Sequence, residues 1–258
     1  MATAGGDLSS TRGSIRSVSL HFTARARHFE RRLDAAPAGR ERAGTIVGYA
    51  NNNLQNGMTI VTAQFNSIGK NGKFNLSTLV PNTYGTSFYL TDSYGFPLST
   101  YTWTDCGGQD WDTPNVWVDD ANNIISSSEF DIGEGLVILG TSNADKIQSS
   151  GNVVCEDVLF ELRNGMTFVG NPFPTSVVAR ELIPNAYGTA FYKVDSYGFP
   201  QDTYTWTDCG GPDWDTPDVW VDESNEILSD NLVLTPGEGI CVLGNSDTDT
   251  ITIPAPEL

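Results

Sequence analysis

One stretch of this chain occurs twice, and this repeat limits the fold more than any other feature. Residues 82–120 and residues 185–223 are 39 residues each, and 30 of these positions are identical without a gap. Shorter matches extend the copies on both sides, since Asn56-Gly57 returns as Asn164-Gly165 and a Gly-Glu-Gly motif occurs later in each copy. A repeat of about 100 residues is too long for a solenoid unit and long enough to bury its own core.

The copies divide the chain into three predicted parts. We expect residues 44–150 and residues 151–258 to form one β domain each. Residues 1–43 differ in composition, because eight arginines and four acidic residues give this arm a charge of +4 within a chain of net charge −18. The arm is expected to be disordered or to form a short basic helix, whose apolar stripe would dock on a membrane surface or a partner. That stripe consists of Phe22, Ala26, Phe29 and Leu33.

The spacing of apolar residues within the copies predicts strands. Residues 100–104 alternate threonine with aromatic side chains, and residues 203–207 repeat the pattern, which is typical of a half-buried strand. Asn56-Gly57 and Asn164-Gly165 favour β-hairpin turns. Short turns are expected at residues 75–79 or 179–183. Further strands are predicted at residues 58–65, 84–90, 115–119 and 136–139. The predicted fold class is all-β, with two tandem antiparallel β-sandwich or barrel repeats.

The duplicated segment carries an acidic loop with glycines. Calcium prefers several carboxylate and carbonyl oxygens from such a loop, although the spacing does not match an EF-hand. The candidate calcium ligands are Asp105, Asp110, Asp112, Asp208, Asp213 and Asp215. The alternative is a solvated loop in which aspartates cap turns. No other cofactor is expected.

The same loop contains tryptophans that recur in both copies. Trp103 alternates in phase with Tyr101 and is expected in the core. Trp111 and its copy Trp214 lie between two aspartates in a glycine-containing segment, so these two are the candidate ligand-binding residues. An exposed tryptophan beside acidic groups would suit a carbohydrate.

The four cysteines differ between the copies. Cys106 and Cys209 are equivalent, whereas Cys155 and Cys241 correspond to Val47 and Val137 of the first copy. If those two positions touch, a Val–Val contact in one copy would be a Cys155–Cys241 disulfide in the other. Two free thiols are the alternative.

Catalysis and nucleic-acid binding find little support in the sequence. Both histidines lie in the arm, so neither copy offers a Ser-His-Asp or Cys-His arrangement. A strongly acidic surface repels phosphate backbones. No run of 18 apolar residues exists, so no transmembrane segment is expected.

The order of apolar run, Asn-Gly turn, aromatic strand and terminal Gly-Glu-Gly strand, over residues 44–243, resembles secreted bacterial proteins with tandem β-sandwich repeats. This resemblance implies an exported structural or adhesive role and transfers no functional residue. The expectation is a non-catalytic, extracellular or cell-surface structural subunit that self-associates or contacts the cell envelope or its polysaccharides. The alternative is a pair of carbohydrate-binding modules, with or without calcium.

Overall fold

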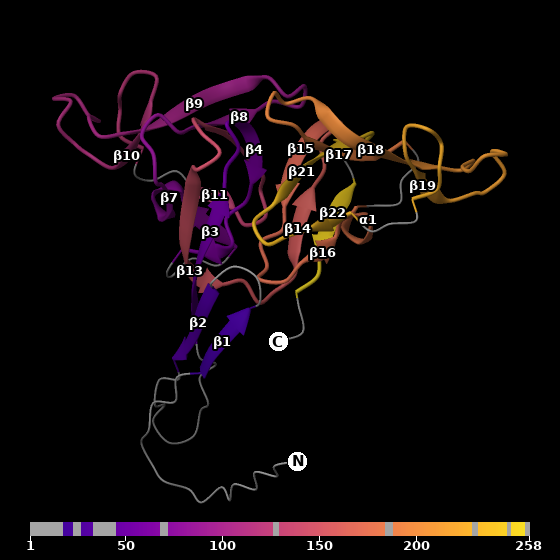
Figure 1. Cartoon of the computed structure of the whole chain (residues 1–258), viewed down its shortest axis with the longest axis horizontal. Coiled ribbons are helices and arrows are strands. Elements are labelled where there is room, and N and C mark those ends of the chain that lie inside the picture. The colour runs from indigo at the N-terminus through magenta and orange to yellow at the C-terminus, as the bar shows by residue number, and fades with distance from the viewer. Residues whose placement is uncertain are drawn as a thin grey trace, which may run out of the picture.

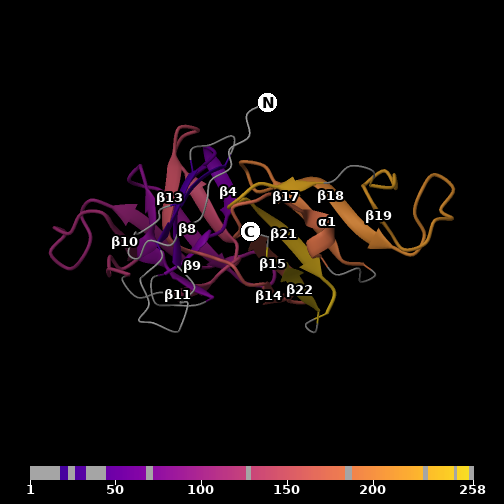
Figure 2. The same ribbon diagram turned by 90° about the horizontal axis from the view of Figure 1, so that it is seen from below.

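The computed structural model describes most of the chain beyond the arm. The described residues are 18–22, 27–32, 45–67, 72–125, 129–183, 188–228, 232–246 and 249–255. The fold is all-β, as predicted, and consists of several antiparallel sheets (Figure 1). Figure 2 shows the two repeats side by side from below.

The first repeat has one five-stranded sheet of order β4-β12-β8-β9-β10. A second sheet pairs β13 with β3, β5 and β7, and β6 pairs with β11. The elements are β3 (Thr45–Asn53), β4 (Gly57–Val61), β5 (Phe65–Asn66), β6 (Lys73–Asn75), the 3-10 helix η1 (Leu76–Thr78), β7 (Leu79–Pro81), β8 (Ser87–Thr91), β9 (Pro97–Thr104), β10 (Val116–Asp119), β11 (Glu129–Asp131), β12 (Leu136–Gly140) and β13 (Lys146–Val153).

The second repeat has the same strand order in its five-stranded sheet, β15-β21-β17-β18-β19, with β14 paired to β22 and β16 paired to β20. The elements are β14 (Val158–Glu161), β15 (Gly165–Gly170), β16 (Val177–Val178), α1 (Ala179–Leu182), β17 (Ala190–Val194), β18 (Pro200–Thr207), β19 (Val219–Val221), β20 (Val233–Leu234), β21 (Gly239–Gly244) and β22 (Thr250–Ile253). The strand order of both large sheets is linear, so within the described residues neither closes into a barrel.

The arm contributes strands, which corrects the predicted disorder or helix where the arm is described. β1 (Val18–Phe22) and β2 (Arg27–Arg32) pair with each other, and β2 extends the sheet along β3. The sequence alternates Val18, Leu20 and Phe22 with polar residues, and this two-residue period competes with the helical stripe that we used. The edge of β3 offers backbone hydrogen-bond partners to β2, and this pairing favours the strand over the helix. The rest of residues 1–43 lies outside the described residues.

The strands predicted from alternation are confirmed. β9 and β18 contain the two Thr-aromatic segments, and β8, β10 and β12 overlap the other predicted runs. The run at residues 58–65 is divided between β4 and β5. The short turns expected near residues 75–79 and 179–183 are η1 and α1. Trp103 is 5% exposed and packs edge-on against Trp117, as expected for a core residue.

The two Asn-Gly pairs do not form hairpin turns, which corrects a second prediction. β3 and β4 belong to different sheets, so the chain passes from one sheet to another at Gly57. Gly57 has a φ of 117° and Gly165 has a φ of 121°, a region that favours glycine. These glycines permit a close approach between the repeats instead of a tight turn.

The repeats meet through reciprocal backbone hydrogen bonds. The Met58 amide donates to the Ser196 carbonyl at 2.8 Å, and the Met166 amide donates to the Ser93 carbonyl at 2.8 Å. A Cβ on Gly57 would lie 2.1 Å from the Ser196 carbonyl oxygen, so only glycine fits there.

A second pair of hydrogen bonds between the repeats is equally reciprocal. Thr62 donates to Gly237 at 3.0 Å, and Gly170 donates to Gly133 at 2.9 Å. In each pair of hydrogen bonds, the two donors are equivalent residues of the two repeats, and so are the two acceptors. The two repeats are therefore related by an approximate two-fold axis, as in an isologous dimer.

Buried apolar side chains form a cluster that continues from one repeat to the other. It includes Phe88 and Trp117 in the first repeat and Phe191 and Trp220 in the second. The expected boundary between residues 150 and 151 falls inside β13, whose residues 146–152 pair with β3. The division into separate domains stays a prediction.

Asp145 anchors the connection from β12 to β13. Its carboxylate is buried and accepts hydrogen bonds from the backbone amides of Thr141 and Ser142, and from the hydroxyls of Thr83, Thr141 and Ser142, at 2.7–3.0 Å. Burial alone would raise the pKa of Asp145, but these hydrogen bonds outweigh it and lower the pKa to about 2. The ionised carboxylate therefore stabilises the folded chain.

We predict that Gly57→Ala or Gly165→Ala lowers the free energy of unfolding by roughly 3 kcal/mol or more, because each adds a steric clash to a strained φ. Thermal unfolding followed by circular dichroism measures the loss. Gly85→Ala is the matched control, since Gly85 has a φ of 86° but its Cβ would meet nothing closer than 3.7 Å. The control should lose only about 1 kcal/mol. Equal losses in the three variants would contradict the close approach.

We also predict that Asp145→Asn destabilises the protein by on the order of 2 kcal/mol at neutral pH. Because folding lowers the pKa of Asp145, its contribution is complete above the unfolded pKa and disappears as the pH falls toward 2. The difference in stability between the variant and the parent should therefore shrink between about pH 5 and pH 2. Asp249→Asn at the equivalent position is the control and should cost less, because among the described residues one oxygen of Asp249 is buried without a hydrogen-bond partner. A difference that does not change with pH would refute this role.

Candidate functional site

The candidate site is built on two loops of the same conformation, which we call the tryptophan loops, at residues 107–113 and 210–216. Each follows the long strand β9 or β18. The Gly107 amide donates to Thr113 at 2.8 Å and the Thr113 amide returns a bond of 3.0 Å, which closes the first loop. Gly210 and Thr216 close the second loop with bonds of 2.8 and 3.1 Å. The duplicated sequence thus gives a duplicated local structure.

Side chains outside the loops hold them in place. The Asn122 amide donates to the Gly108 carbonyl at 2.5 Å, and Asn225 donates to Gly211 at 2.6 Å. Hydrogen bonds of this kind across 14 residues fix a loop to the strand connection beside it. The tryptophan loops are therefore ordered platforms.

The candidate ligand-binding tryptophans lie at the exposed end of these loops. Trp111 is 64% exposed and Trp214 is 63% exposed, as the sequence predicted. Their φ angles are 55° and 57°, in the left-handed region that a bulky residue seldom adopts. This conformation costs on the order of 1 kcal/mol, and an exposed side chain recovers little of that cost by packing. An indole held out in this way suits a contact with another molecule.

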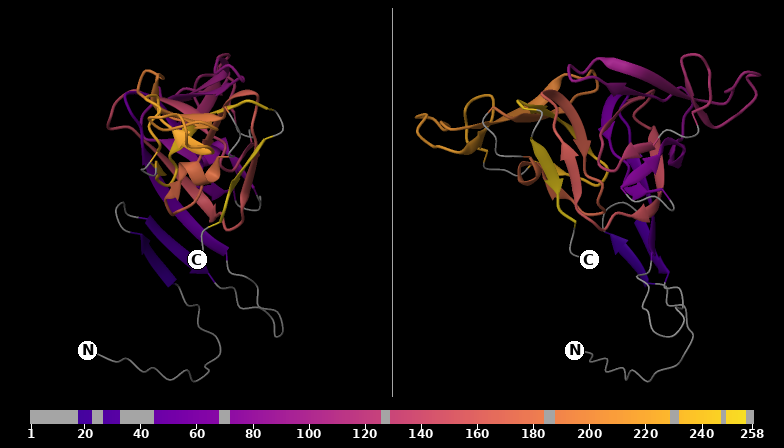
Figure 3. Two further views of the ribbon diagram at one scale, coloured as in Figure 1. Left: turned by 90° about the vertical axis from the view of Figure 1, so that its right-hand side faces the viewer. Right: turned by 180° about the vertical axis from the view of Figure 1, so that it is seen from behind.

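The tryptophan loops lie at opposite ends of the molecule. The segments after β9 and after β18 project away from each other in Figure 1, and the view from behind in Figure 3 shows the same arrangement. One molecule therefore presents the same surface in two directions.

A second pair of exposed aromatic groups, which was not predicted from the sequence, lies in the β8–β9 and β17–β18 turns. The Asp92 carboxylate accepts bonds from the Tyr94 and Phe96 amides at 2.8 and 2.9 Å, and Asp195 does the same in the second repeat. Their aromatic side chains are between 66% and 82% exposed: Tyr94, Phe96, Tyr197 and Phe199. The sequence did contain a signal for this exposure. The tight turn Ser-Tyr-Gly-Phe-Pro has no other large side chains against which its two aromatic rings could be buried.

These aromatic turns lie where the repeats meet. Gly95 approaches the Met166 sulfur and Gly198 approaches the Met58 side chain, so each turn rests on a methionine of the opposite repeat. The turns are thus near the approximate two-fold axis, whereas the tryptophan loops are far from it (Figure 1).

The six candidate calcium ligands, Asp105, Asp110, Asp112, Asp208, Asp213 and Asp215, are all exposed. Within the described ranges, no group of three or more histidine, cysteine, aspartate or glutamate side chains is arranged to hold a metal ion. The structure therefore brings these aspartates to the surface around the tryptophans without assembling a ligand set.

The predicted Cys155–Cys241 disulfide is wrong in this structure, because all four cysteines, which are all described, are free thiols. Cys241 is fully buried on β21 between Phe168 and Tyr192, whereas Cys155 is exposed beyond the end of β13. The equivalent valines belong to different sheets, since Val47 pairs with Asn152 of β13 and Val137 pairs with Ile60 of β4.

The two thiols of that predicted pair are protonated at neutral pH. Burial raises the pKa of Cys241 to about 11, while partial desolvation and the negative charge of Glu156 raise the pKa of the exposed Cys155. Cys106 and Cys209 are half-buried beside Thr104 and Thr207 of their own repeats. These two cysteines do not form a disulfide between the repeats.

Comparison with known proteins identifies no relative from which a role can be transferred. No protein-family model matches the chain, and no curated protein or solved structure does. Among the described residues, no helix is long and apolar enough to cross a membrane. The function has to be inferred from the exposed aromatic surfaces themselves.

We predict that Trp111→Asn and Trp214→Asn leave the melting temperature unchanged or raise it by a few degrees. Asparagine tolerates a positive φ, and the exposed indoles contribute little buried area. Thermal unfolding by circular dichroism tests this. Trp103→Asn is the control and should cost more than about 3 kcal/mol, because that indole is in the core. A loss of more than about 1 kcal/mol at Trp111 would show that this indole stabilises the fold.

Proposed function

We propose that this protein is a non-catalytic, bivalent structural or adhesive subunit that associates through its paired aromatic surfaces. The observation that carries the proposal is the pair of tryptophan loops. Two indoles of equal exposure stand in the same strained conformation at opposite ends of one molecule. Neither the strain nor the exposure favours folding, so both are expected to serve a contact.

Exposed aromatic side chains are the residue type best suited to such a contact. Tyrosine and tryptophan dominate the energetics of protein interfaces, since they bury a large area with few rotatable bonds. Ordered loops lose little entropy on binding, because hydrogen bonds already fix them. The tryptophan loops combine both properties.

The geometry makes each molecule bivalent. Identical contacts that point in opposite directions allow one molecule to link two partners, and contacts that do not close into a ring propagate into filaments or layers. Two weak contacts on one rigid body also give much tighter binding to a surface than either contact alone.

The charge of the protein favours some partners over others. A net charge of −18 disfavours contact with nucleic acid and makes molecules repel each other at low ionic strength. Partners that suit this surface are further copies of the chain, screened by salt, or uncharged polysaccharide of a cell envelope. We propose that the protein acts outside the cell or at the cell surface, where such partners would be found.

A pair of carbohydrate-binding modules is the second candidate, without an assigned metal. Trp111 lies between Asp110 and Asp112, and an indole face beside carboxylates can stack on a sugar ring and accept hydrogen bonds from its hydroxyls. Both candidates use the tryptophan loops, and they differ in the partner.

We predict that the double variant Trp111→Ala/Trp214→Ala weakens self-association at least tenfold. Sedimentation or light scattering at about 0.1 and 1 M salt measures the association, which should increase with salt as repulsion is screened. Each single variant should still form pairs but no larger assemblies. Leu159→Ala is the matched control, since this side chain is 66% exposed but outside the aromatic surfaces.

If the protein stays monomeric at every concentration and salt level, the hypothesis of self-association is wrong. A glycan array then decides what remains. Binding that depends on both tryptophans would favour the carbohydrate-binding modules, and the absence of any binding would refute the proposed role of the tryptophan loops.

A further inference from the structure

The approximate two-fold axis generates two equivalent junctions between the repeats, and they differ. At the first junction Glu134 bridges to Val169, and at the second Glu238 bridges to Val61. Each glutamate accepts a hydrogen bond from the backbone amide three residues earlier, Asp131 in one case and Thr235 in the other. The backbone is therefore the same in both junctions, and the side chains around it can be compared position by position.

Apolar side chains fill the first junction. The Phe160 ring and Val158 pack over Gly133, so closely that a Cβ on this glycine would lie 2.5 Å from the ring. Phe160 and Leu90 are both packed against the main apolar cluster. Arg163 spans the gap and donates to the Thr91 carbonyl at 3.2 Å.

Smaller or polar residues occupy the same positions at the second junction. Asn52 stands over Gly237 where Phe160 stands over Gly133, because a Cβ added to Gly237 would collide with the Asn52 side-chain amide. Gln55 replaces Arg163, and Lys193 replaces Leu90. These three exchanges remove the groups that fill the first junction.

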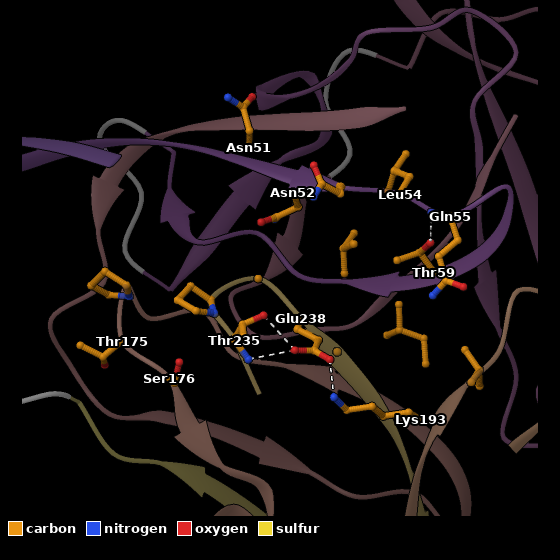
Figure 4. Close-up of a pocket in the computed structure, with 18 residues that line it drawn as sticks. Asn51, Asn52, Leu54, Gln55, Thr59, Thr175, Ser176, Lys193, Thr235 and Glu238 are labelled. Atoms are coloured by element: carbon orange, nitrogen blue, oxygen red, sulfur yellow. Dashed lines mark hydrogen bonds and ion pairs between the residues drawn. The ribbon is translucent and has the colours of Figure 1, made fainter. Parts of the chain in front are cut away.

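The result is an open cavity of about 750 Å³ between the repeats at the second junction. Its walls come from β3 and β4 of the first repeat and from β17 and the β20–β21 connection of the second (Figure 4). A volume of this size lies within the range of small-molecule sites. The cavity thus belongs to the second junction, and the apolar side chains at the first junction indicate which substitutions would fill it.

The polar groups of the cavity form a connected set. Lys193 Nζ lies 2.5 Å from Glu238 Oε1, while Glu238 Oε2 accepts bonds from the Thr235 amide and hydroxyl at 2.9 and 2.8 Å (Figure 4). Lys193 and Glu238 remain 29% and 30% exposed, so a ligand can reach them. Asn52, Gln55, Thr59 and Thr175 add amide and hydroxyl groups to the lining.

The charges in the cavity cancel. Lys193 and Glu238 are the charged residues of the lining, and they neutralise each other. Burial alone would raise the pKa of Glu238, but the hydrogen bond and charge of Lys193, with the hydrogen bonds of Thr235, lower it, so the ion pair persists at neutral pH. At the closed junction, where leucine replaces the lysine, burial raises the pKa of Glu134.

This lining selects a class of ligand. Amide and hydroxyl groups both donate and accept hydrogen bonds, and so do the hydroxyls of a sugar. A phosphate or carboxylate would have to compete with Glu238 for one lysine, within an acidic protein. A purely apolar ligand would leave the amides and the ion pair without solvent or partners.

We infer that the cavity at the second junction binds a neutral, polyhydroxylated ligand of the size of a mono- or disaccharide. The site is separate from the tryptophan loops, and the inference does not depend on their role. Because the ligand would contact both repeats, its binding would strengthen the junction between them.

The test uses the full-length protein and a panel of neutral saccharides, namely glucose, galactose, maltose, lactose and cellobiose. Glycerol, glucose 6-phosphate and glucuronate serve as the small-polyol and charged comparisons. Saturable binding of at least one neutral saccharide by calorimetry or ligand-detected NMR is expected, with at least tenfold weaker binding of the charged compounds. A hundredfold excess over Kd should raise the melting temperature by roughly 5–10 °C.

Variants that copy the closed junction separate this site from a general effect of sugars on stability. Asn52→Phe and Lys193→Leu each introduce the residue of the other repeat, so they should fold normally and weaken binding at least tenfold. Sugars also stabilise proteins without binding, but that effect would be equal in the parent and the variants. Trp111→Ala/Trp214→Ala is the matched control and should bind the saccharide as the parent does.

Three results would overturn the inference. They are no saturable binding by any neutral saccharide, binding that both junction variants retain, and binding that only the tryptophan variant loses. If Asn52→Phe does not fold, Lys193→Leu decides alone, because it changes the polarity of the cavity without adding a ring.

Discussion

The structure depends on two backbone contacts that only glycine permits. At Gly57 and Gly165 the chain passes within hydrogen-bonding distance of Ser196 and Ser93 in the opposite repeat. Because the contacting residues are the same in both copies, one favourable contact is automatically made twice. Each contact aligns a strand of one repeat with the turn of the other, and the buried clusters then join across the axis. A single duplicated sequence thus builds its own two-fold interface within one chain.

Two kinds of surface follow from this arrangement. Positions that are identical in both copies produce paired features, such as the tryptophan loops at the two ends and the aromatic turns near the axis. Positions that differ have their largest effect at the junctions, where the side chains of both repeats meet. Asn52 and Lys193 open one junction, whereas Phe160 and Leu90 close the other. The symmetry of the backbone and the asymmetry of a few side chains therefore produce different surface features.

Local signals in the sequence predicted the strands well and the contacts between them poorly. The alternation around Trp103 is a property of one strand, so the sequence alone identified its buried face. Asn56-Gly57 was interpreted as a hairpin because the positive φ of a glycine is local information, whereas the carbonyl of Ser196 that requires it is 139 residues away in the chain. The helix predicted around Phe22 failed for a related reason, since the pairing of β2 with β3 is a long-range contact.

The cysteines also show that contacts distant in the sequence are hard to predict, because here a predicted contact is absent from the structure. The exchange of two valines for Cys155 and Cys241 suggested that the positions touch, but residues can covary in type between copies without being neighbours. Cys241 replaces Val137 as a small apolar group in a fully packed strand, which free cysteine does well. Exposed Trp111 and Trp214 could be predicted because a glycine-containing acidic loop cannot bury an indole. Asn52 could not, because its significance appears only when the residue opposite it, Gly237, and the equivalent Phe160 are known.

The comparison of the two junctions gives the strongest argument that the open one serves a purpose. Replacing the partly buried Phe160 by asparagine over a glycine gives up apolar burial that the closed junction retains, on the order of 1 kcal/mol. Lys193 adds the cost of partly desolvating one more charge, although its attraction to Glu238 offsets part of the burial cost that Glu134 bears without a lysine at the closed junction. The first junction demonstrates that this backbone can be packed with apolar side chains. The stability of the fold therefore does not require an open cavity at the second junction. The cavity therefore weakens the interface between the repeats, and a ligand that touches Asn52 and Glu238 together would restore the contact.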